Sequence, residues 1–398
     1  MARIGVFASR QWPALRGLDE EEIRKYRDEL GLNLVVLGAL PPDDPKDPEL
    51  RRARFLHSTE ASSVRLPPPH VQAANPFPEG LRGRIGPGAH FVKDDARLRR
   101  AIELFKENGI ECWLVTLAWQ GSGAPLAPEL MARARDGTRA DALDATLGGE
   151  SPASMFCPSN EAVNDWYREY LPYLVSEYGV DGIFFTHTRY PASAAMLQTC
   201  ACDACKRAAA ALGLDWQQEW LTVRAAVLRS QVESIASALK AAHPNTTLAI
   251  QSLFPSLALL LGHRPSEGFR GVDEVVFMTS YLKEVAWTML GSLTRLSGDE
   301  ELGPALEATG WAKYASHLPS TLADLDATLA GDFTWEPWHE EFLSYEIAEA
   351  VAITSATGVM IGLRGNMWPK EVVDRLRMGA LSAGATGVLH QTYKLPWS

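Results

Sequence analysis

The sequence predicts a closed (β/α)8 barrel, a fold in which eight parallel strands alternate with helices. Short apolar runs rich in β-forming residues recur along the 398 residues, and helical patterns stand between them. There are eight such runs, the number of strands that closes this barrel. An open doubly wound sheet is the structural alternative. However, Ala8-Ser-Arg-Gln-Trp12 follows the first run, where that fold would place a glycine-rich phosphate-binding turn.

The elements can be justified in order from their local signals. Each strand is a run of three to six mostly apolar residues, and the helices between them show amphipathic spacing. Pro369 stands at the first turn of the last helix, where proline is tolerated. The predicted strands are 4–7, 34–37, 112–117, 182–185, 248–250, 274–277, 359–361 and 387–389, and the predicted helices are 19–30, 95–108, 161–177, 216–242 and 370–382.

Three connections are much longer than an ordinary strand-to-helix loop. They span about 41–87, 120–156 and 281–355 within one predicted domain covering residues 1–398. All three follow the carboxyl ends of predicted strands, so we expect them to cover the same mouth of the barrel. Loops of this length in compact domains are usually functional or disordered. The alternative is that they are surface decoration or an oligomer contact.

Composition restricts the class of partner. The formal net charge is −11, and 46% of the residues are hydrophobic. This charge argues against nucleic acid or an anionic membrane surface, which both require clustered cations. It favours a small molecule or an oligosaccharide as substrate, and it leaves a homo-oligomer open. The chain starts directly with a strand-like segment and lacks a long apolar stretch, so we expect a cytoplasmic protein.

Four of the five cysteines predict a metal centre. Cys157 is separated by a long gap from Cys200, Cys202 and Cys205, which lie within six residues. Thiolates at this spacing can converge on one tetrahedral zinc ion, and a reducing compartment favours metal binding over disulfides. Four thiolates leave no open coordination position, so the predicted zinc is structural. The alternative is four reduced cysteines without a shared role.

Several segments resemble the glycoside-hydrolase-like TIM-barrel families of bacterial genomes. They are Phe156-Cys-Pro-Ser-Asn160, Tyr178-Gly-Val-Asp-Gly182 with Arg189-Tyr-Pro191, Val272-Asp-Glu-Val-Val-Phe-Met278, and the closing Ala380 to Leu389. The cysteine spacing is also similar to the zinc site of the family 42 β-galactosidases, beside the fourth strand of a barrel. The resemblance covers about half of the chain. It implies a barrel fold and activity on carbohydrates.

The sequence departs from that resemblance just past the fourth strand. These families usually carry an acidic residue there, whereas this chain has Thr186-His187-Thr188-Arg189. His187 titrates near neutrality and could transfer a proton in place of the acid. Arg189 presents a planar fork suited to a carboxylate or to sugar hydroxyls. The alternatives are that His187 orients a ligand or bonds to a carbonyl group, and that Arg189 holds the loop by pairing with a carboxylate.

The predicted catalytic carboxyl group is Glu336. It lies in an acidic, aromatic segment between Trp335 and Trp338, and aromatic faces bind sugar rings and desolvate a neighbouring carboxyl group. The alternative is that Glu336 belongs to the entry of the next helix. Residues at the strand ends converge on the barrel axis, so a further set is predicted to bind substrate. That set is Trp12, Trp119, Tyr281, Trp335, Arg364 and His390, together with Arg189.

Three functional hypotheses follow from these features. The leading one is a glycoside-hydrolase-like enzyme that uses Glu336 and His187. The second is a carbohydrate-binding barrel without hydrolytic activity, motivated by the missing acid after the fourth strand. The third is a lyase or isomerase acting on an acidic sugar, for which Arg189 and Arg364 would bind the carboxylate.

Overall fold

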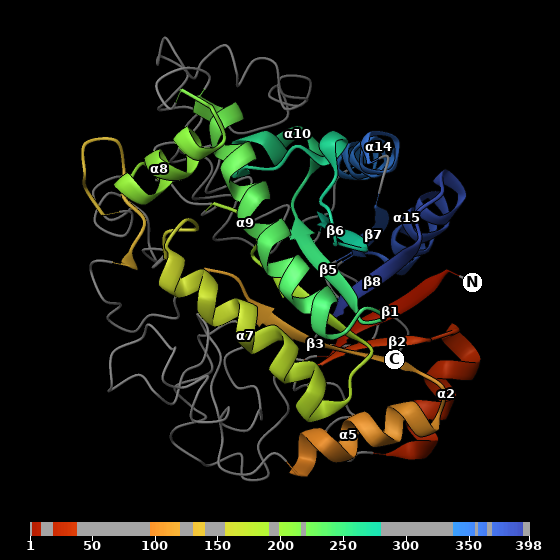
Figure 1. Ribbon diagram of the computed structural model, residues 1–398. Helices are drawn as coiled ribbons and strands as arrows, with labels where there is room; N and C mark the ends of the chain where they lie inside the picture. Colours follow the sequence, from red (N-terminus) through yellow and green to blue (C-terminus); the bar gives the residue numbers. More distant parts are fainter. Residues whose placement is uncertain are drawn as a thin grey trace.

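A computed structural model describes the chain in ten segments that include every predicted strand. Figure 1 shows the strands at the centre of the molecule, with helices packed outside them. Among the described residues, no helix is both long and apolar enough to cross a bilayer. The described segments are 2–8, 19–37, 96–119, 130–139, 156–190, 199–215, 220–279, 337–354, 357–363 and 368–392.

The eight strands form a closed parallel barrel in which each strand pairs with its neighbour in sequence and β8 pairs with β1. The predicted fold class is therefore confirmed, and each predicted strand is present within three residues of its expected bounds. The strands are β1 Arg3–Ala8, β2 Leu34–Leu37, β3 Glu111–Leu117, β4 Gly182–Thr186, β5 Thr247–Ser252, β6 Glu274–Met278, β7 Gly358–Leu363 and β8 Gly387–Thr392.

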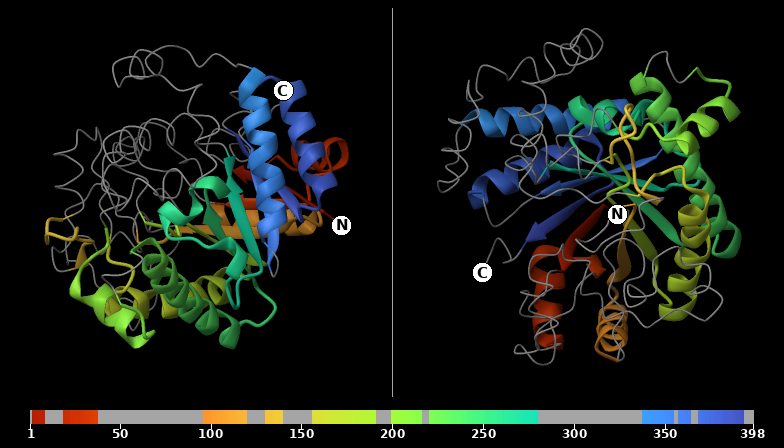
Figure 2. Two further views of the ribbon diagram at one scale, coloured as in Figure 1. Left: turned by 90° about the horizontal axis from the view of Figure 1, so that it is seen from above. Right: turned by 90° about the vertical axis from the view of Figure 1, so that its left-hand side faces the viewer.

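Helices cover the outside of the barrel (Figure 2). Local signals set their ends: Asn160 caps the first turn of the helix after β3 by accepting a hydrogen bond from the Val163 N–H, and Gly179 ends that helix in a left-handed conformation. The helices are α2 Glu20–Leu30, α5 Ala96–Glu107, α7 Glu161–Tyr178, α8 Asp203–Ala211, α9 Trp220–Ala242, α10 Pro255–Ala258, α14 Pro337–Ile353 and α15 Lys370–Ala383, with short 3-10 turns η4 Leu259–Leu261 and η5 Pro265–Glu267.

The predicted long connection 281–355 contains a full helix at its end. Helix α14 packs against α15 and α10 and supplies the helix between β6 and β7. The stretch between β6 and α14 is therefore shorter than the sequence suggested. The predicted connection 41–87 and most of 120–156 lie outside the described residues.

An ion cluster lies at the amino ends of the strands. Arg3 pairs with Glu111 at 3.0 Å and with Glu274 at 2.6 Å, joining β1, β3 and β6. Glu274 is buried, and Thr386 donates a hydrogen bond to it at 2.6 Å. Gly358 is required beside it, because a Cβ atom there would overlap the Glu274 carboxylate. This cluster closes the face of the barrel opposite the expected mouth.

Candidate active site and metal centre

Two phenylalanine rings show which side chains face the interior of the barrel. Phe7 of β1 and Phe184 of β4 lie on strands that are not neighbours, yet their ring centroids are 6.2 Å apart. Both rings therefore point inward. Since strand side chains alternate, Thr186 also points inward, as does Gln251, two residues beyond Ala249, the register partner of Phe184. These two polar residues end β4 and β5 at the mouth.

Gln251 holds the turn after β4 through four hydrogen bonds. Its Oε1 atom accepts hydrogen bonds from the Thr186 hydroxyl and, at 2.7 Å, from the His187 N–H. The Thr188 hydroxyl donates to the Gln251 carbonyl at 3.0 Å and accepts from the Gln251 N–H at 3.1 Å. His187 has a positive φ of 57°, a conformation that costs energy in a residue with a side chain and that these bonds maintain.

His187 and Arg189 both follow β4 in the turn at this mouth. The His187 side chain is buried, and its Nδ1 atom lies 3.2 Å from the Thr186 hydroxyl oxygen. Arg189 is half-buried, and its backbone N–H donates to the His187 carbonyl at 2.7 Å. Its guanidinium donates to the carbonyl of Tyr190 at 3.3 Å. Their roles with a substrate stay a prediction.

A buried arginine supports this turn from the helix side. The guanidinium of Arg224, on α9, lies 4.1 Å from the ring centroid of Tyr190 and donates to the Leu260 carbonyl at 3.2 Å. Burial lowers the pKa of Arg224 to about 10, so the side chain is still charged at neutral pH. The nearby Cys200 and Cys205 raise the pKa of Arg224 and so partly offset the effect of burial. Arg224 thus lies between the β4 turn and the cysteine cluster.

The four predicted cysteines come together in one cluster. Their Sγ atoms all lie within 4.8 Å of one another, with Cys157 at 3.2 Å from Cys202 and 3.6 Å from Cys205. Three of the side chains are buried, and Cys202 is half-buried. Four sulfurs around one zinc ion would be separated by about 3.8 Å, given zinc–sulfur bonds of about 2.3 Å. The donor set and its spacing therefore fit a tetrahedral metal ion.

Backbone hydrogen bonds around the cluster suit thiolate ligands. The N–H of Arg133 donates to the Cys200 sulfur at 3.4 Å, and the N–H of Ser159 donates to the Cys157 sulfur at 3.3 Å. Hydrogen bonds from the other three thiols lower the pKa of Cys202, which favours a thiolate in the cluster even before a metal binds. The cluster ties the segment before α7 to the segment before α8. It can bind a metal, and the metal's identity belongs to the proposal below.

The structure places Trp119, a predicted substrate-binding residue, in the helix layer. Its indole N–H donates to the Asn164 side chain of α7 at 2.9 Å, and its ring packs on Tyr167 and Phe185. Phe185 lies between two inward-facing residues of β4, so it points outward. The positive φ of 49° at Trp119 turns the chain toward that side. Trp119 therefore faces the helix layer and not the mouth of the barrel.

His390, predicted to bind substrate, is also on the helix side of its strand. It pairs with Val6, which lies between the inward-facing Gly5 and Phe7, so Val6 and His390 both point outward. Its side chain is fully buried, and burial lowers its pKa to about 3, with a further contribution from Arg377 of α15. His390 stands near the end of β8, but the alternation of the strand directs this ring away from the mouth.

The remaining predicted residues lie outside the described part of the chain. Among the strands that the structure describes, the only carboxylates are Glu111 and Glu274, and both stand at the amino ends. No described strand therefore brings an acid to the mouth. The predicted residues outside the described segments are Glu336, Trp335, Trp12, Tyr281 and Arg364.

One buried carboxyl group was missed by the sequence analysis. Glu346 lies on α14 with no exposed surface, and its Oε2 atom accepts a hydrogen bond from the Ser256 N–H at 3.1 Å at the start of α10. Burial raises its pKa to about 7. Its Oε1 atom has no hydrogen-bond partner among the described residues. A signal was present, because Glu346 stands among the largely apolar residues 342–353.

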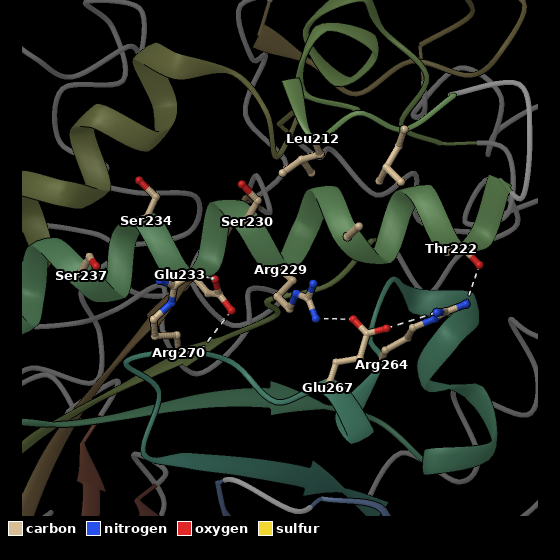
Figure 3. Close-up of a pocket in the computed structure, with 12 residues that line it drawn as sticks. Leu212, Thr222, Arg229, Ser230, Glu233, Ser234, Ser237, Arg264, Glu267 and Arg270 are labelled. Atoms are coloured by element: carbon tan, nitrogen blue, oxygen red, sulfur yellow. Dashed lines mark hydrogen bonds and ion pairs between the residues drawn. The ribbon is translucent and has the colours of Figure 1, made fainter. Parts of the chain in front are cut away.

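A groove of about 620 Å³ lies along α9, between it and residues 264–270 (Figure 3). Three arginines line it, and each is paired with a carboxylate. Arg229 and Arg264 pair with Glu267, the latter at 3.2 Å, and Arg270 pairs with Glu233 at 3.2 Å. Because each of these arginines already has a carboxylate partner, the groove gives no indication of a bound ligand.

Comparison with known proteins supports the fold class. No family model matches the sequence, and no curated protein matches it. Solved structures do match. The glycoside hydrolase domain of PgaB (BpsB) from Bordetella bronchiseptica has a TM-score of 0.55 at 13% identity, over 98% of this chain and 93% of that one. The catalytic domain of a β-amylase from Paenibacillus polymyxa has a TM-score of 0.52 at 10% identity, over 98% and 92%.

A β-galactosidase from Bacillus circulans sp. alkalophilus is a third similar structure. Its TM-score is 0.51 at 12% identity, over 98% of this chain and 50% of the galactosidase. All three are named as glycoside-acting enzymes, and at these identities the likeness establishes a shared barrel fold.

Proposed function

We propose that this chain is a glycoside-hydrolase-like enzyme that acts on a carbohydrate at the carboxyl-end mouth of its barrel. The observation that carries the proposal is the polar group formed by Thr186, His187 and Gln251, which occupies the end of β4 and β5 where barrel enzymes build their active sites. The three solved structures compared above are named as glycoside-acting enzymes, which supports this reaction class.

The proposed roles follow from the chemistry of each side chain. His187 transfers a proton, because an imidazole is the side chain that titrates near neutral pH. Arg189, beside it, donates hydrogen bonds to sugar hydroxyls. Hydrolysis of the usual kind needs two carboxyl groups, and Glu336 is proposed as one of them. Further proposed substrate contacts are Trp12, Tyr281, Trp335 and Arg364.

We also propose that the four-cysteine cluster binds a zinc ion in a structural role. A tetrahedral site with four thiolates is coordinatively closed, so the ion would stabilise the segments beside the mouth without taking part in the reaction. Three buried sulfurs and the backbone donors around them support this assignment over transient metal binding.

The function is tested by measuring glycoside turnover in three matched proteins. Aryl glycosides and oligosaccharides are screened with the wild type, and each cleaved substrate is then tested with His187→Gln and with His243→Gln. His243 follows α9 near the amino end of β5 and is a control far from the mouth along the strand. We expect His187→Gln to lower kcat by about 10²-fold or more and His243→Gln to leave it unchanged. Equal rates in all three proteins would contradict the role of His187.

A second function, carbohydrate binding without cleavage, is favoured by one observation. The described strand ends carry no carboxylate, whereas the usual reaction needs an acid at the mouth. Calorimetry with oligosaccharides, followed by chromatography after long incubation, separates the two functions. Binding with the sugar recovered intact would support the binding module, and shorter products would support the enzyme.

A further inference from the structure

Gln251 is a buried side chain of which only one half is satisfied. It is 1% exposed at the carboxyl end of β5, and its Oε1 atom accepts from both Thr186 and His187. The orientation of the amide is fixed, because the backbone N–H of His187 can only donate and so requires the oxygen. The Nε2 atom then stands buried, with no hydrogen-bond partner in the described segments. Such a buried donor is costly unless water or a ligand satisfies it.

The same bonds determine which ring nitrogen of His187 carries hydrogen. The Thr186 hydroxyl has one hydrogen, which it donates to the Oε1 atom of Gln251, an acceptor only. Toward the Nδ1 atom of His187, at 3.2 Å, the hydroxyl oxygen can therefore only accept. Nδ1 must then carry a hydrogen. In the neutral ring, Nε2 consequently holds the lone pair and is the basic nitrogen.

We propose that Gln251 is a positioning and ligand-binding residue at the mouth of the barrel. Through Thr186 it fixes His187 in the tautomer whose Nε2 atom accepts a proton, and through its own Nε2–H it donates to an oxygen of the ligand. A buried, uncharged amide donor of this kind suits the oxygen of a hydroxyl group. The ligand class is thus a neutral polyhydroxylated molecule. Only this ligand assignment rests on the proposed function.

The tautomer is tested by NMR of the imidazole nitrogens in ¹⁵N-labelled protein. Loss of one signal in His187→Gln assigns the ring. We expect the wild type and the control Ser252→Ala to have hydrogen on Nδ1 in the neutral ring. Gln251→Met removes the acceptor, so the Thr186 hydroxyl can donate to Nδ1 and the Nε2–H form gains population. Gln251→Glu keeps an acceptor and should retain the wild-type tautomer.

Two results would overturn the positioning role: an Nε2–H ring in the wild type, or an unchanged ring in a folded Gln251→Met protein. If that variant does not fold, Thr186→Val tests the same point, because it removes the oxygen to which Nδ1 donates. The expected result is loss of the tautomer preference, and an unchanged preference would contradict the proposal. Circular dichroism establishes that each variant is folded.

The ligand half is tested with methyl glycosides of glucose, galactose and mannose as probes. We expect a sugar that binds by calorimetry to shift the side-chain amide signal of Gln251, and Gln251→Glu, which lacks the amide donor, to bind it about tenfold more weakly. A bound sugar that leaves this signal unmoved refutes the donor role. If none of the three binds, the ligand assignment falls, while the proposed function is decided separately by the turnover screen and the tautomer by the NMR result.

Discussion

Replacing Glu346 by glutamine should stabilise the protein more at alkaline pH than at acidic pH. Burial raises the pKa of this carboxyl group from 4.5 to about 7. The folded state therefore binds the proton more tightly than the unfolded state. Stability contributed by this group is present below pH 4.5 and is lost as the pH rises toward 7. A glutamine, which does not ionise, avoids that loss.

The magnitude follows from the same values. A tenfold change in acidity corresponds to about 1.4 kcal/mol, so a rise from 4.5 to about 7 is worth about 3 kcal/mol. Any cost of placing the amide in the site is the same at both pH values and cancels. The difference in unfolding free energy between Glu346→Gln and the wild type should therefore be about 3 kcal/mol larger at pH 8 than at pH 4.

Urea denaturation at pH 4 and pH 8, followed by tryptophan fluorescence, measures this difference. The control is Glu341→Gln, because Glu341 is exposed on the same helix. It should shift the unfolding free energy by the same small amount at both pH values. If Glu346→Gln also has the same effect at pH 4 and pH 8, then water or a cation reaches the carboxyl group and the reasoning from burial is wrong.

Three further predictions concern the metal and the packing. The purified chain should contain one zinc ion by elemental analysis. Cys205→Ser should lose the ion and melt at a lower temperature, whereas Cys112→Ala, which lies outside the cluster, should keep it. Equal metal content in both variants would contradict the site. Gly358→Ala should destabilise the protein in thermal melts, because its new Cβ atom would overlap the Glu274 carboxylate. Gly379→Ala should stabilise the protein by about 0.5–1 kcal/mol, because Gly379 lies inside α15 and an added Cβ atom would meet only open space. A Gly358→Ala protein as stable as the Gly379→Ala protein would contradict this account of the packing.

The barrel was predictable because its signals are local. Each strand is an apolar run of about five residues, and each run appears in the structure as a strand. The cysteine cluster was equally predictable, since three of its four cysteines lie within six residues, a spacing typical of metal sites.

The inward or outward direction of individual strand-end residues was not predictable from the same signals. Trp119 and His390 stand at the expected ends of strands, yet both face the helices. A shift of one residue along a strand reverses the side-chain direction, and register between strands is a long-range property. Gln251 was noted as a strand-end residue, but its role became visible only through its bonds to Thr186 and His187. The burial of Glu346 depends on the packing of α14 against α10.

The most direct test of the proposed activity is product analysis in ¹⁸O-labelled water. An oligosaccharide that the wild type cleaves is incubated with the wild type and with His187→Gln, and the products are examined by mass spectrometry. Hydrolysis at the mouth predicts one ¹⁸O atom at each newly formed reducing end in the wild type, and little or no product in the variant. An unsaturated or rearranged product without ¹⁸O, or undiminished cleavage by His187→Gln, would contradict the proposal.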